Sequence, residues 1–395
     1  MAASSPATPN PSERPMHRFL TEEQSALRDT TRHFAEREIL PRAAAIDRED
    51  RFDRDLYRGM AALGLFGVAL REGAGGSELG AIGACIAMEE LARCSGAVAN
   101  AFAIPVEAVL FFDQHGNARQ QALIPGILAG EIIPATAVTE PDHGSDVAGL
   151  RTTARREGEG WVLNGTKAWV TLGGVVDALT VFARTGVEGG HRAISCFLLD
   201  GKSPGLIRGK NETLLGMHGL EDCQIALDGV HAPADALVGP ENGAFKMAMG
   251  NFNFSRLLMS AMALGMAQAA FEDAVAYAKS RRQFGEPIIT FQAVQFMLAD
   301  MSTDIAAARL LIHHAARLYD AGLPIAKEAA QAKLFTTDMA MKHVSNALQI
   351  HGGNGYSREY RVERLFRDVR LAQIYEGTNQ IQRLIIARQV EREMA

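Results

Sequence analysis

The stretch Trp161-Val-Leu-Asn-Gly-Thr-Lys-Ala-Trp-Val170 decides the fold class, because it is the clearest β-type segment between regions with helical patterns. Asn164-Gly165 within it suits the positive φ angles of a type I′ turn, so we expect a β-hairpin here. Further strands are predicted at about 178–183, 194–199 and 224–227, separated by glycines and prolines. These segments predict a compact antiparallel β-barrel or sandwich over residues 136–239.

Helical patterns lie on both sides of this β region. On the N-terminal side, Thr21-Glu-Glu-Gln24 has the residue types of a capping box, and apolar residues recur at helical intervals from Ser25 to Ile39. On the C-terminal side, long helices are predicted at about 243–281, 291–321 and 325–351, and a last one from near Thr378. Four helices with short connections favour an antiparallel bundle.

The predicted fold is therefore α+β, with its parts in sequence order. Residues 1–16 are rich in Ser, Ala and Pro and are expected to form a flexible tail. Residues 17–135 form a helical N-terminal domain, residues 136–239 the middle β domain, and residues 240–395 a C-terminal four-helix-bundle domain. A chain of 395 residues is long enough for two or three domains.

Composition limits the kinds of partner. The net charge of −6 argues against a broad nucleic-acid-binding surface. The most apolar stretch, residues 257–270, is shorter than the about 20 residues of a membrane-spanning helix, so we expect no membrane span. The N-terminus lacks the apolar region of a secretory signal. We expect a cytoplasmic location in a bacterium, with the mitochondrial matrix as the alternative.

Cysteine spacing points to no metal site. The four cysteines are Cys85, Cys94, Cys196 and Cys223. No two of them form a C-x-x-C pair, so neither a zinc ribbon nor a disulfide framework is indicated. We expect buried, reduced thiols.

Three segments carry residue types that a hydrophobic core does not need. Val138–Asp146 offers small polar side chains and backbone N–H groups to a ligand, or is a capped turn. Gln349–Tyr356 has three glycines in four positions, which allow close approach of a phosphate or a ring, or end a helix. It follows a helix, so it is not the dinucleotide fingerprint. In Ile374–Arg383, Glu376 is placed to act as a base, or to favour the N-terminus of the next helix.

Together these segments resemble the acyl-CoA dehydrogenases, a flavoprotein family, from about Phe19 to Arg388. The matching motifs are T-E-P-x-x-G-S-D at 139–146, N-G-T-K-x-W-V-T at 164–171, R-R-Q-F-G at 281–285, Q-I-H-G-G-N-G-Y at 349–356 and Y-E-G-T-N-Q-I-Q-R at 375–383. The resemblance implies a helical N-terminal domain, a middle β domain and a C-terminal four-helix bundle, as the patterns do. It also implies a homotetramer built as a dimer of dimers.

The resemblance implies FAD-dependent α,β-dehydrogenation of an acyl-CoA thioester to the trans-2-enoyl-CoA, in fatty acid or amino acid catabolism. Glu376 matches the catalytic base that removes the α-proton, while flavin N5 takes the β-hydride. The backbone N–H of Glu376 and a flavin hydroxyl would hydrogen-bond the thioester oxygen. An electron-transfer flavoprotein would accept the electrons. Burial beside the acyl chain should raise the pKa of Glu376.

The resemblance also assigns FAD contacts by matched position. Trp169 should pack against the flavin ring, and Thr171 should hydrogen-bond near N5. Arg281, Phe284 and Gln349 are among the residues expected to reach the adenine half of a flavin held by a neighbouring subunit. The matched cofactor-binding positions are Val138, Thr139, Ser145, Trp169, Thr171, Arg281, Phe284, Gln292, Gln349, Gly352, Gly353, Thr378 and Gln380.

Four residues are expected to contact the thioester substrate. They are Ser145, Asn253, Arg256 and Gly377. Asn253 stands where many family members have Asp, and Asp142-His143 replaces a common Gly-Ala pair, which puts the CoA contacts in doubt. Ser255 is not acidic, which leaves Glu376 as the only matched base.

The length of the acyl group is inferred from the helix that is expected to line the far end of the acyl pocket. Val98 and Phe102 fall on that helix by rough alignment. The bulk of Phe102 would shorten the pocket, which favours a short or medium chain.

Two alternatives would use the same fold. A flavin-dependent oxidase or monooxygenase usually lacks the glutamate of the Y-E-G-T motif, so Glu376 argues against it. A non-catalytic flavoprotein, such as the DNA-associated relatives, would carry a basic surface. The negative net charge of this chain does not favour that class.

Overall fold

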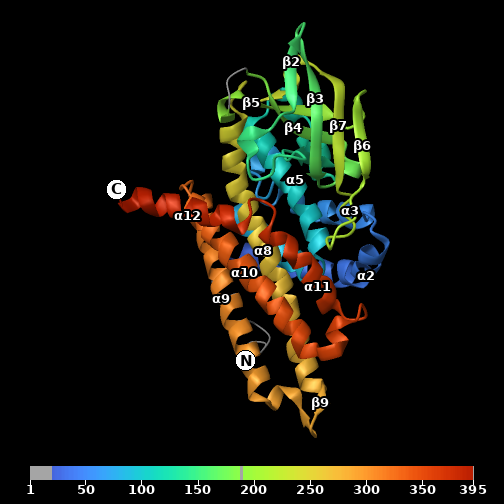
Figure 1. Ribbon diagram of the computed structural model, residues 1–395, viewed down its shortest axis with the longest axis vertical. Helices are drawn as coiled ribbons and strands as arrows, with labels where there is room; N and C mark the ends of the chain where they lie inside the picture. Colours follow the sequence, from blue (N-terminus) through green and yellow to red (C-terminus); the bar gives the residue numbers. More distant parts are fainter. Residues whose placement is uncertain (1–19, 187–189, 395) are drawn as a thin grey trace, which may run out of the picture.

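The computed structural model describes residues 20–186 and 190–394, so the predicted tail at residues 1–16 lies outside the described residues. Helices, a β sheet and more helices follow one another in the predicted order. The sheet lies at one end of the molecule, and the long C-terminal helices run away from it toward the other end (Figure 1). The prediction of an α+β fold with two helical parts around a β domain is confirmed.

The N-terminal part is a group of helices in which two, α4 and α5, are largely buried. The capping box at Thr21 is present: its Oγ1 accepts from the Gln24 N–H, and the Gln24 side chain accepts from the Thr21 N–H, both at 3.2 Å. Nearly every residue of α4 and most of α5 are buried, because α4 and α5 pack against each other and both pack against α8. The elements are α1 (Glu22–Phe34), a π-helical turn (Ala35–Ile39), α2 (Leu40–Glu49), α3 (Arg54–Ala62), α4 (Gly80–Ala92), α5 (Gly96–His115), α6 (Ala118–Gln121) and α7 (Ile124–Leu128).

The middle domain is one eight-stranded sheet. Its strands are β1 (Pro134–Ala137), β2 (Thr153–Glu157), β3 (Gly160–Val170), β4 (Ala178–Arg184), β5 (Ile194–Asp200), β6 (Leu206–Asn211), β7 (Cys223–Ala232) and β8 (Leu237–Val238). The order is β6-β7-β3-β2-β4-β5-β8, and β1 pairs with β4. The sheet is mixed, because β1 and β2 both run parallel to β4 while the other pairs are antiparallel.

The hairpin predicted at Asn164-Gly165 is wrong. Strand β3 runs through both residues, and its register with β7 shifts at this point, as in a β-bulge. The two-residue turn lies earlier, at Gly158-Glu159, between the paired ends of β2 and β3. Glycine is needed at 165 for another reason, since a Cβ there would lie 2.5 Å from the Thr152 hydroxyl oxygen.

The C-terminal part consists of one short helix, α11, and of long helices whose predicted ends agree with the structure to within about two residues. They are α8 (Ala244–Ser280), α9 (Gln292–Asp320), α10 (Ala326–His351), α11 (Arg361–Val369) and α12 (Asn379–Met394). A small hairpin, β9 (Arg282–Gln283) and β10 (Glu286–Pro287), joins α8 to α9. Helices α8, α9 and α10 pack against one another, and α12 packs on α10 and then extends away from the body (Figure 1). The short helix α11 was not predicted.

Two helices, α5 and α8, are long and apolar enough to cross a membrane by length and composition alone. Most of each apolar window is buried inside the fold, so this is weak evidence for a span. Their burial is that of core helices, and they contribute much of the largest hydrophobic cluster. The four cysteines are free and buried, as predicted.

Candidate active site

Glu376 lies in the short segment between α11 and α12. Glu376 and Gly377 both have left-handed backbone conformations, with φ of 54° and 84°. For a glutamate this conformation is strained, and such strain gathers at functional sites. Its Oε2 atom is buried without a hydrogen-bond partner among the described residues. Burial raises the pKa of Glu376, while the positive charges of Arg256 and Lys333 oppose the rise.

Helix α10 holds this segment in place. Lys333, which is completely buried, donates from Nζ to the Gly377 carbonyl and to Asn379 Oδ1, both at 2.9 Å. Asn379 donates in turn to Thr337 Oγ1 at 2.9 Å. Gln382 also donates to the Gly377 carbonyl, at 2.7 Å. Burial lowers the pKa of Lys333 to about 8, although the charge of Glu376 raises it.

Arg256 on α8 is close enough for its charge to act on Glu376. Its side chain is 6% exposed, and its Nε has no hydrogen-bond partner among the described residues. Nη1 donates to Asn253 Oδ1 at 2.8 Å, so the predicted CoA contact at Asn253 already holds the guanidinium. Burial lowers the pKa of Arg256, and Glu376 opposes this shift.

Glu107 of α5 joins this group, although no motif pointed to it. Its carboxyl interacts with the charge of Glu376 and forms a hydrogen bond with the side chain of Ser255 on α8. Burial raises the pKa of Glu107 well above its usual value, Glu376 raises it further, and the hydrogen bond opposes both. Burial raises the pKa of Tyr375, and the charges of both glutamates raise it further. The only sequence signal is a lone charge between residues 96 and 112.

The loop after β1 and the end of β3 form another surface, the Trp169 wall, which carries several of the predicted flavin positions. Lys167 is completely buried and donates from Nζ to the Val138 carbonyl at 3.0 Å and to Glu140 at 2.9 Å. The Ala168 N–H donates to the Thr139 carbonyl at 2.9 Å. These contacts fix the backbone at two of the predicted flavin positions.

Trp169 directly follows this fixed backbone on β3. Trp169 has φ of 57° and is 59% exposed, so its ring stands out from the wall as a bare aromatic surface. Thr171 hydrogen-bonds the carboxyl of Asp222, whose pKa burial raises to about 6. The charge of Asp222 in turn helps to raise the pKa of Tyr375, the residue before Glu376.

The buried pair Lys167–Glu140 supports the loop from beneath. Burial lowers the pKa of Lys167 to about 8, and Glu140 opposes that shift. Burial alone would raise the pKa of Glu140, but Lys167 and the N–H groups of Arg151 and Thr152 hold it below its usual value. Neither Lys167 nor Glu140 was singled out in the sequence.

The remaining predicted residues, in this loop and in the Glu376 segment, are exposed or partly exposed. Ser145 and Gln380 are exposed. Thr378 directly precedes α12, and its Oγ1 accepts from the Ile381 N–H at 3.3 Å. At Gly377, φ of 84° favours glycine.

A second group of predicted cofactor residues lies at the far end of the long helices. It consists of Arg281, Phe284, Gln292, Gln349, Gly352 and Gly353, all of them exposed. Tyr277 joins its two segments, because its hydroxyl accepts from Asn354 at 3.0 Å and its ring stacks on His351. Arg281 directly follows α8, and the stretch of this helix from Arg256 to its end is about 38 Å long. The structure therefore separates the predicted cofactor residues into two clusters.

The side chains of this second group leave room for a ligand. Phe284 is 96% exposed and has φ of 53°. A Cβ added at Gly352 or at Gly353 would meet no other atom within 4 Å. An exposed aromatic ring beside open glycine backbone suits a flat, ring-containing ligand.

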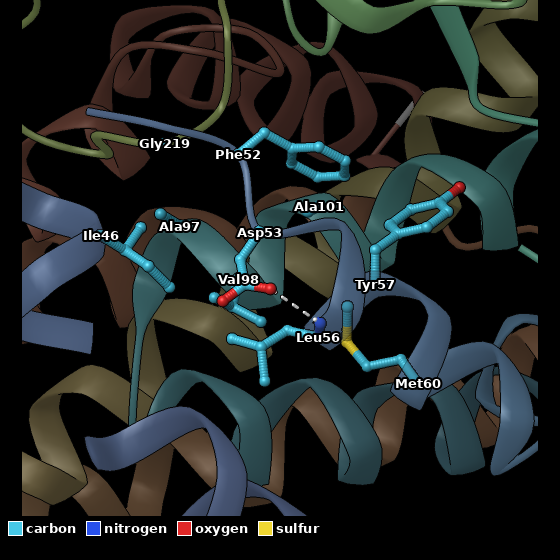
Figure 2. Close-up of a pocket in the computed structure, with 10 residues that line it drawn as sticks. All are labelled: Ile46, Phe52, Asp53, Leu56, Tyr57, Met60, Ala97, Val98, Ala101 and Gly219. Carbon is cyan, nitrogen blue, oxygen red and sulfur yellow. Dashed lines mark hydrogen bonds between the residues drawn. The ribbon is translucent and has the colours of Figure 1, made fainter. Parts of the chain in front are cut away.

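A separate small cavity lies between α3 and α5. Figure 2 shows the side chains of Ile46, Leu56, Met60 and Val98 among those that line it. Phe102, the residue expected to shorten the acyl pocket, is fully buried in the core. Val98 lines this small cavity and Phe102 does not, and the shortening of the acyl pocket by Phe102 stays a prediction.

Three family models match the chain in sequence order. They describe the N-terminal domain of acyl-CoA dehydrogenases at residues 21–131, the middle domain at residues 135–230 and the C-terminal domain at residues 242–391.

Similar proteins match nearly the whole chain. An acyl-CoA dehydrogenase of Bacillus subtilis is 41% identical over 374 residues, which cover 93% of this chain and 98% of the relative. Butyryl-CoA dehydrogenase of Megasphaera elsdenii has a TM-score of 0.92 and 35% identity, covering 94% and 99% of the two chains. A chain from a structure described as the electron transferring flavoprotein of Acidaminococcus fermentans has a TM-score of 0.92 and 37% identity, with the same coverage.

Proposed function

The chain belongs to the acyl-CoA dehydrogenase family of FAD-dependent oxidoreductases, and from that premise we propose that it oxidises a short-chain acyl-CoA to the trans-2-enoyl-CoA. The observation that carries the proposal is Glu376, a buried carboxylate with an unpartnered oxygen on a strained backbone. The similarity to butyryl-CoA dehydrogenase supports a short acyl group.

We assign proton removal to Glu376. A raised pKa makes its carboxylate a stronger base for the weakly acidic α-proton of a thioester. The positive charges of Arg256 and Lys333 oppose that rise and so favour the carboxylate form. The backbone N–H of Glu376 makes no backbone hydrogen bond within the described part of the chain, so it is free to donate to the thioester oxygen.

The residues at the Trp169 wall fit a flavin. Trp169 offers a bare ring face, and the backbone of Val138 and Thr139 is fixed beside it by Lys167 and Ala168. When bound there, FAD supplies the oxidant that accepts the hydride from the β-carbon. The wall residues would hold the flavin ring next to the acyl chain whose α-proton Glu376 removes.

The second cluster fits the other end of a flavin that belongs to a neighbouring copy. One copy presents its Trp169 wall, and another presents Arg281, Phe284 and Gln349. Large apolar side chains are also exposed on α9, α10 and α12, among them Phe296, Leu310 and Leu384. These surfaces suit contacts between copies, and we propose a homotetramer in which FAD bridges two of them.

We propose that the reduced flavin passes its electrons to an electron-transfer flavoprotein. A chain similar to this one comes from a structure whose subject is an electron transferring flavoprotein. This association supports such a flavoprotein as the electron acceptor.

The test is the visible spectrum of the purified holoenzyme during anaerobic addition of acyl-CoAs. The panel runs from butyryl-CoA to long, branched and aromatic thioesters. We expect the flavin to bleach most rapidly with butyryl-CoA and its near homologues. A bound flavin that no thioester bleaches would overturn the proposal.

A further inference from the structure

Two successive residues shortly before α12 have an unusual backbone, and both of their carbonyls meet one side chain. Glu376 and Gly377 have φ of 54° and 84°. Gln382 Nε2 donates to the Glu376 carbonyl at 3.2 Å and to the Gly377 carbonyl at 2.7 Å. Carbonyl oxygens only accept hydrogen bonds, so the amide of Gln382 must turn its NH2 group toward them. A single side chain thus holds two successive peptides of the Glu376 segment.

The position of Gln382 on α12 explains this reach. Helical side chains tilt toward the N-terminus of their helix and cover the turn before them. Gln382 is the fourth residue of α12, and its own N–H donates to the Thr378 carbonyl at 3.0 Å. Its side chain is completely buried, so solvent competes little for its two donors.

The start of α12 is itself fixed to α10. Asn379 is 3% exposed and donates to Asp338 Oδ1 on α10 at 2.7 Å. Lys333 approaches from the same helix and donates to the Gly377 carbonyl at 2.9 Å. The two lone pairs of that carbonyl therefore bind Lys333 and Gln382. The backbone after Glu376 is held from two helices at once.

This support bears on the chemistry of Glu376 through its φ angle. A left-handed conformation costs free energy for a residue with a Cβ, and it persists only where surrounding contacts hold it. The φ angle is the rotation about the N–Cα bond, so it sets the direction of the side chain relative to the N–H of the same residue. If the backbone relaxed to negative φ, the carboxylate and the N–H of Glu376 would no longer face the same point.

Resting on the proposed function, we propose that Gln382 is a positioning residue for proton removal. It holds Glu376 at a φ that lets the carboxylate reach the α-proton while the N–H of the same residue binds the thioester oxygen. In this role Gln382 touches neither the substrate nor the flavin and acts through the backbone. Its contribution is to the rate of proton removal rather than to the affinity for the thioester.

The test separates the rate of flavin bleaching from substrate binding. Gln382→Met keeps the length of the side chain and removes both donors. With increasing butyryl-CoA under anaerobic conditions, the limiting rate of bleaching per bound flavin should fall by about 100-fold, as for a reacting group misplaced by about 1 Å. The half-saturating concentration should stay within about threefold of wild type. Gln382→Glu, whose protonated carboxyl keeps one donor, should lose only about tenfold at the same pH.

The matched control is Gln389→Met, the same change at a partly exposed residue of the same helix. It should leave the limiting rate within about twofold of wild type. Hydrogen exchange followed by mass spectrometry gives a readout without turnover. In the holoenzyme, the amides of residues 374–381 should exchange faster by about tenfold or more in Gln382→Met. Gln389→Met should exchange there at the wild-type rate.

The outcomes are distinguishable. A limiting rate in Gln382→Met within about threefold of wild type, or an equal loss in Gln382→Met and Gln382→Glu, would overturn the positioning role and leave the proposed function intact. If Gln382→Met retains no flavin, Gln382→Glu decides: slower bleaching supports the role, and the wild-type rate overturns it. Wild-type enzyme that bleaches with no thioester would overturn the proposed function, and the exchange comparison would still decide whether Gln382 holds the Glu376 segment.

Discussion

At the scale of single residues, the chemistry depends on a few charges placed where water is scarce. Glu376 needs a raised pKa to act as a base and a nearby positive charge to remain ionised. Arg256 and Lys333 supply that charge from two different helices. The balance between burial and these cations sets the pH range over which the site can work.

The first prediction concerns that balance. Removing the Lys333 charge by Lys333→Met should raise the pKa of Glu376, since Lys333 lowers it. The rate of flavin bleaching requires the ionised carboxylate, so it falls as pH drops through that pKa. Its midpoint should therefore move to higher pH, and the rate at neutral pH should fall by about tenfold or more. Stopped-flow bleaching by butyryl-CoA from about pH 5 to pH 9 measures both.

The matched control is Lys327→Met on the same helix, since Lys327 pairs with Glu393 rather than with the Glu376 segment. It should leave the pH profile where it is. A midpoint that stays in place in Lys333→Met, with flavin content intact, would contradict the charge role of Lys333.

Single residues also mark the limit of sequence reasoning. Glu376 could be predicted because it stands in a motif at a helix junction. Glu107 and Lys333 could not be predicted, because the role of a charged residue within a helix depends on which helix packs against it. Asn164-Gly165 has the composition of a turn, but here it lies within a continuous strand.

At the scale of elements, the buried ion pair Lys167–Glu140 fixes the loop after β1. Lys167 on β3 ties down the loop after β1 through Val138 and Glu140. Without Lys167, Glu140 would remain as a buried charge held chiefly by the backbone N–H groups of Arg151 and Thr152. The strand and the loop therefore depend on each other.

The second prediction follows from that pair. Lys167→Met should lower the free energy of unfolding by about 3–5 kcal/mol, because it leaves an uncompensated buried charge. It should also weaken flavin binding by loosening the Val138 carbonyl. Urea unfolding followed by fluorescence, and the absorbance of bound flavin, measure the two effects.

Lys210→Met provides the comparison, since Lys210 is an exposed residue of β6 in the same domain. We expect a change within about 0.5 kcal/mol for this surface variant. Equal stability of the two variants would contradict the supporting role of the buried pair.

Element types and ends were largely predictable, because glycine or proline lies close to most ends of the long helices. Helices α8, α9 and α10 begin and end close to the predicted positions. The parallel pairing of β1 and β2 with β4 was not predictable. Strand pairing is set by tertiary contacts between distant segments. The alternation of residues along one strand does not indicate which strand it pairs with.

At the scale of the whole molecule, the two clusters of predicted cofactor residues are too far apart along α8 to close one site within a single chain. The family resemblance implies that the second cluster reaches a flavin held by a neighbouring subunit, and the length of α8 gives the separation that such an arrangement needs. In the bridging model, each complete site takes Glu376 from one copy and Arg281 from another.

The third prediction tests this bridging. Arg281→Ala should lose flavin on dilution, while Lys279→Ala, an exposed neighbour near the end of α8, should not. Co-expression of Glu376→Gln with Arg281→Ala should restore active sites, because a mixed pair contains one site with an intact Glu376 and an intact partner Arg281. Flavin content and bleaching by butyryl-CoA measure the recovery.

If both residues served the same site within one chain, no mixed assembly would contain an intact site. Activity of the co-expressed protein no higher than the sum of its separate variants would therefore contradict bridging.

The central claim is that Glu376 removes the α-proton of an acyl-CoA. Its most direct test is anaerobic mixing of butyryl-CoA with wild-type enzyme and with Glu376→Gln at equal flavin content. Glutamine keeps the size of the side chain and cannot accept the proton. We predict that the flavin of the wild type bleaches and that the variant bleaches slower by at least about 100-fold. Bleaching at a similar rate in both proteins would contradict the account.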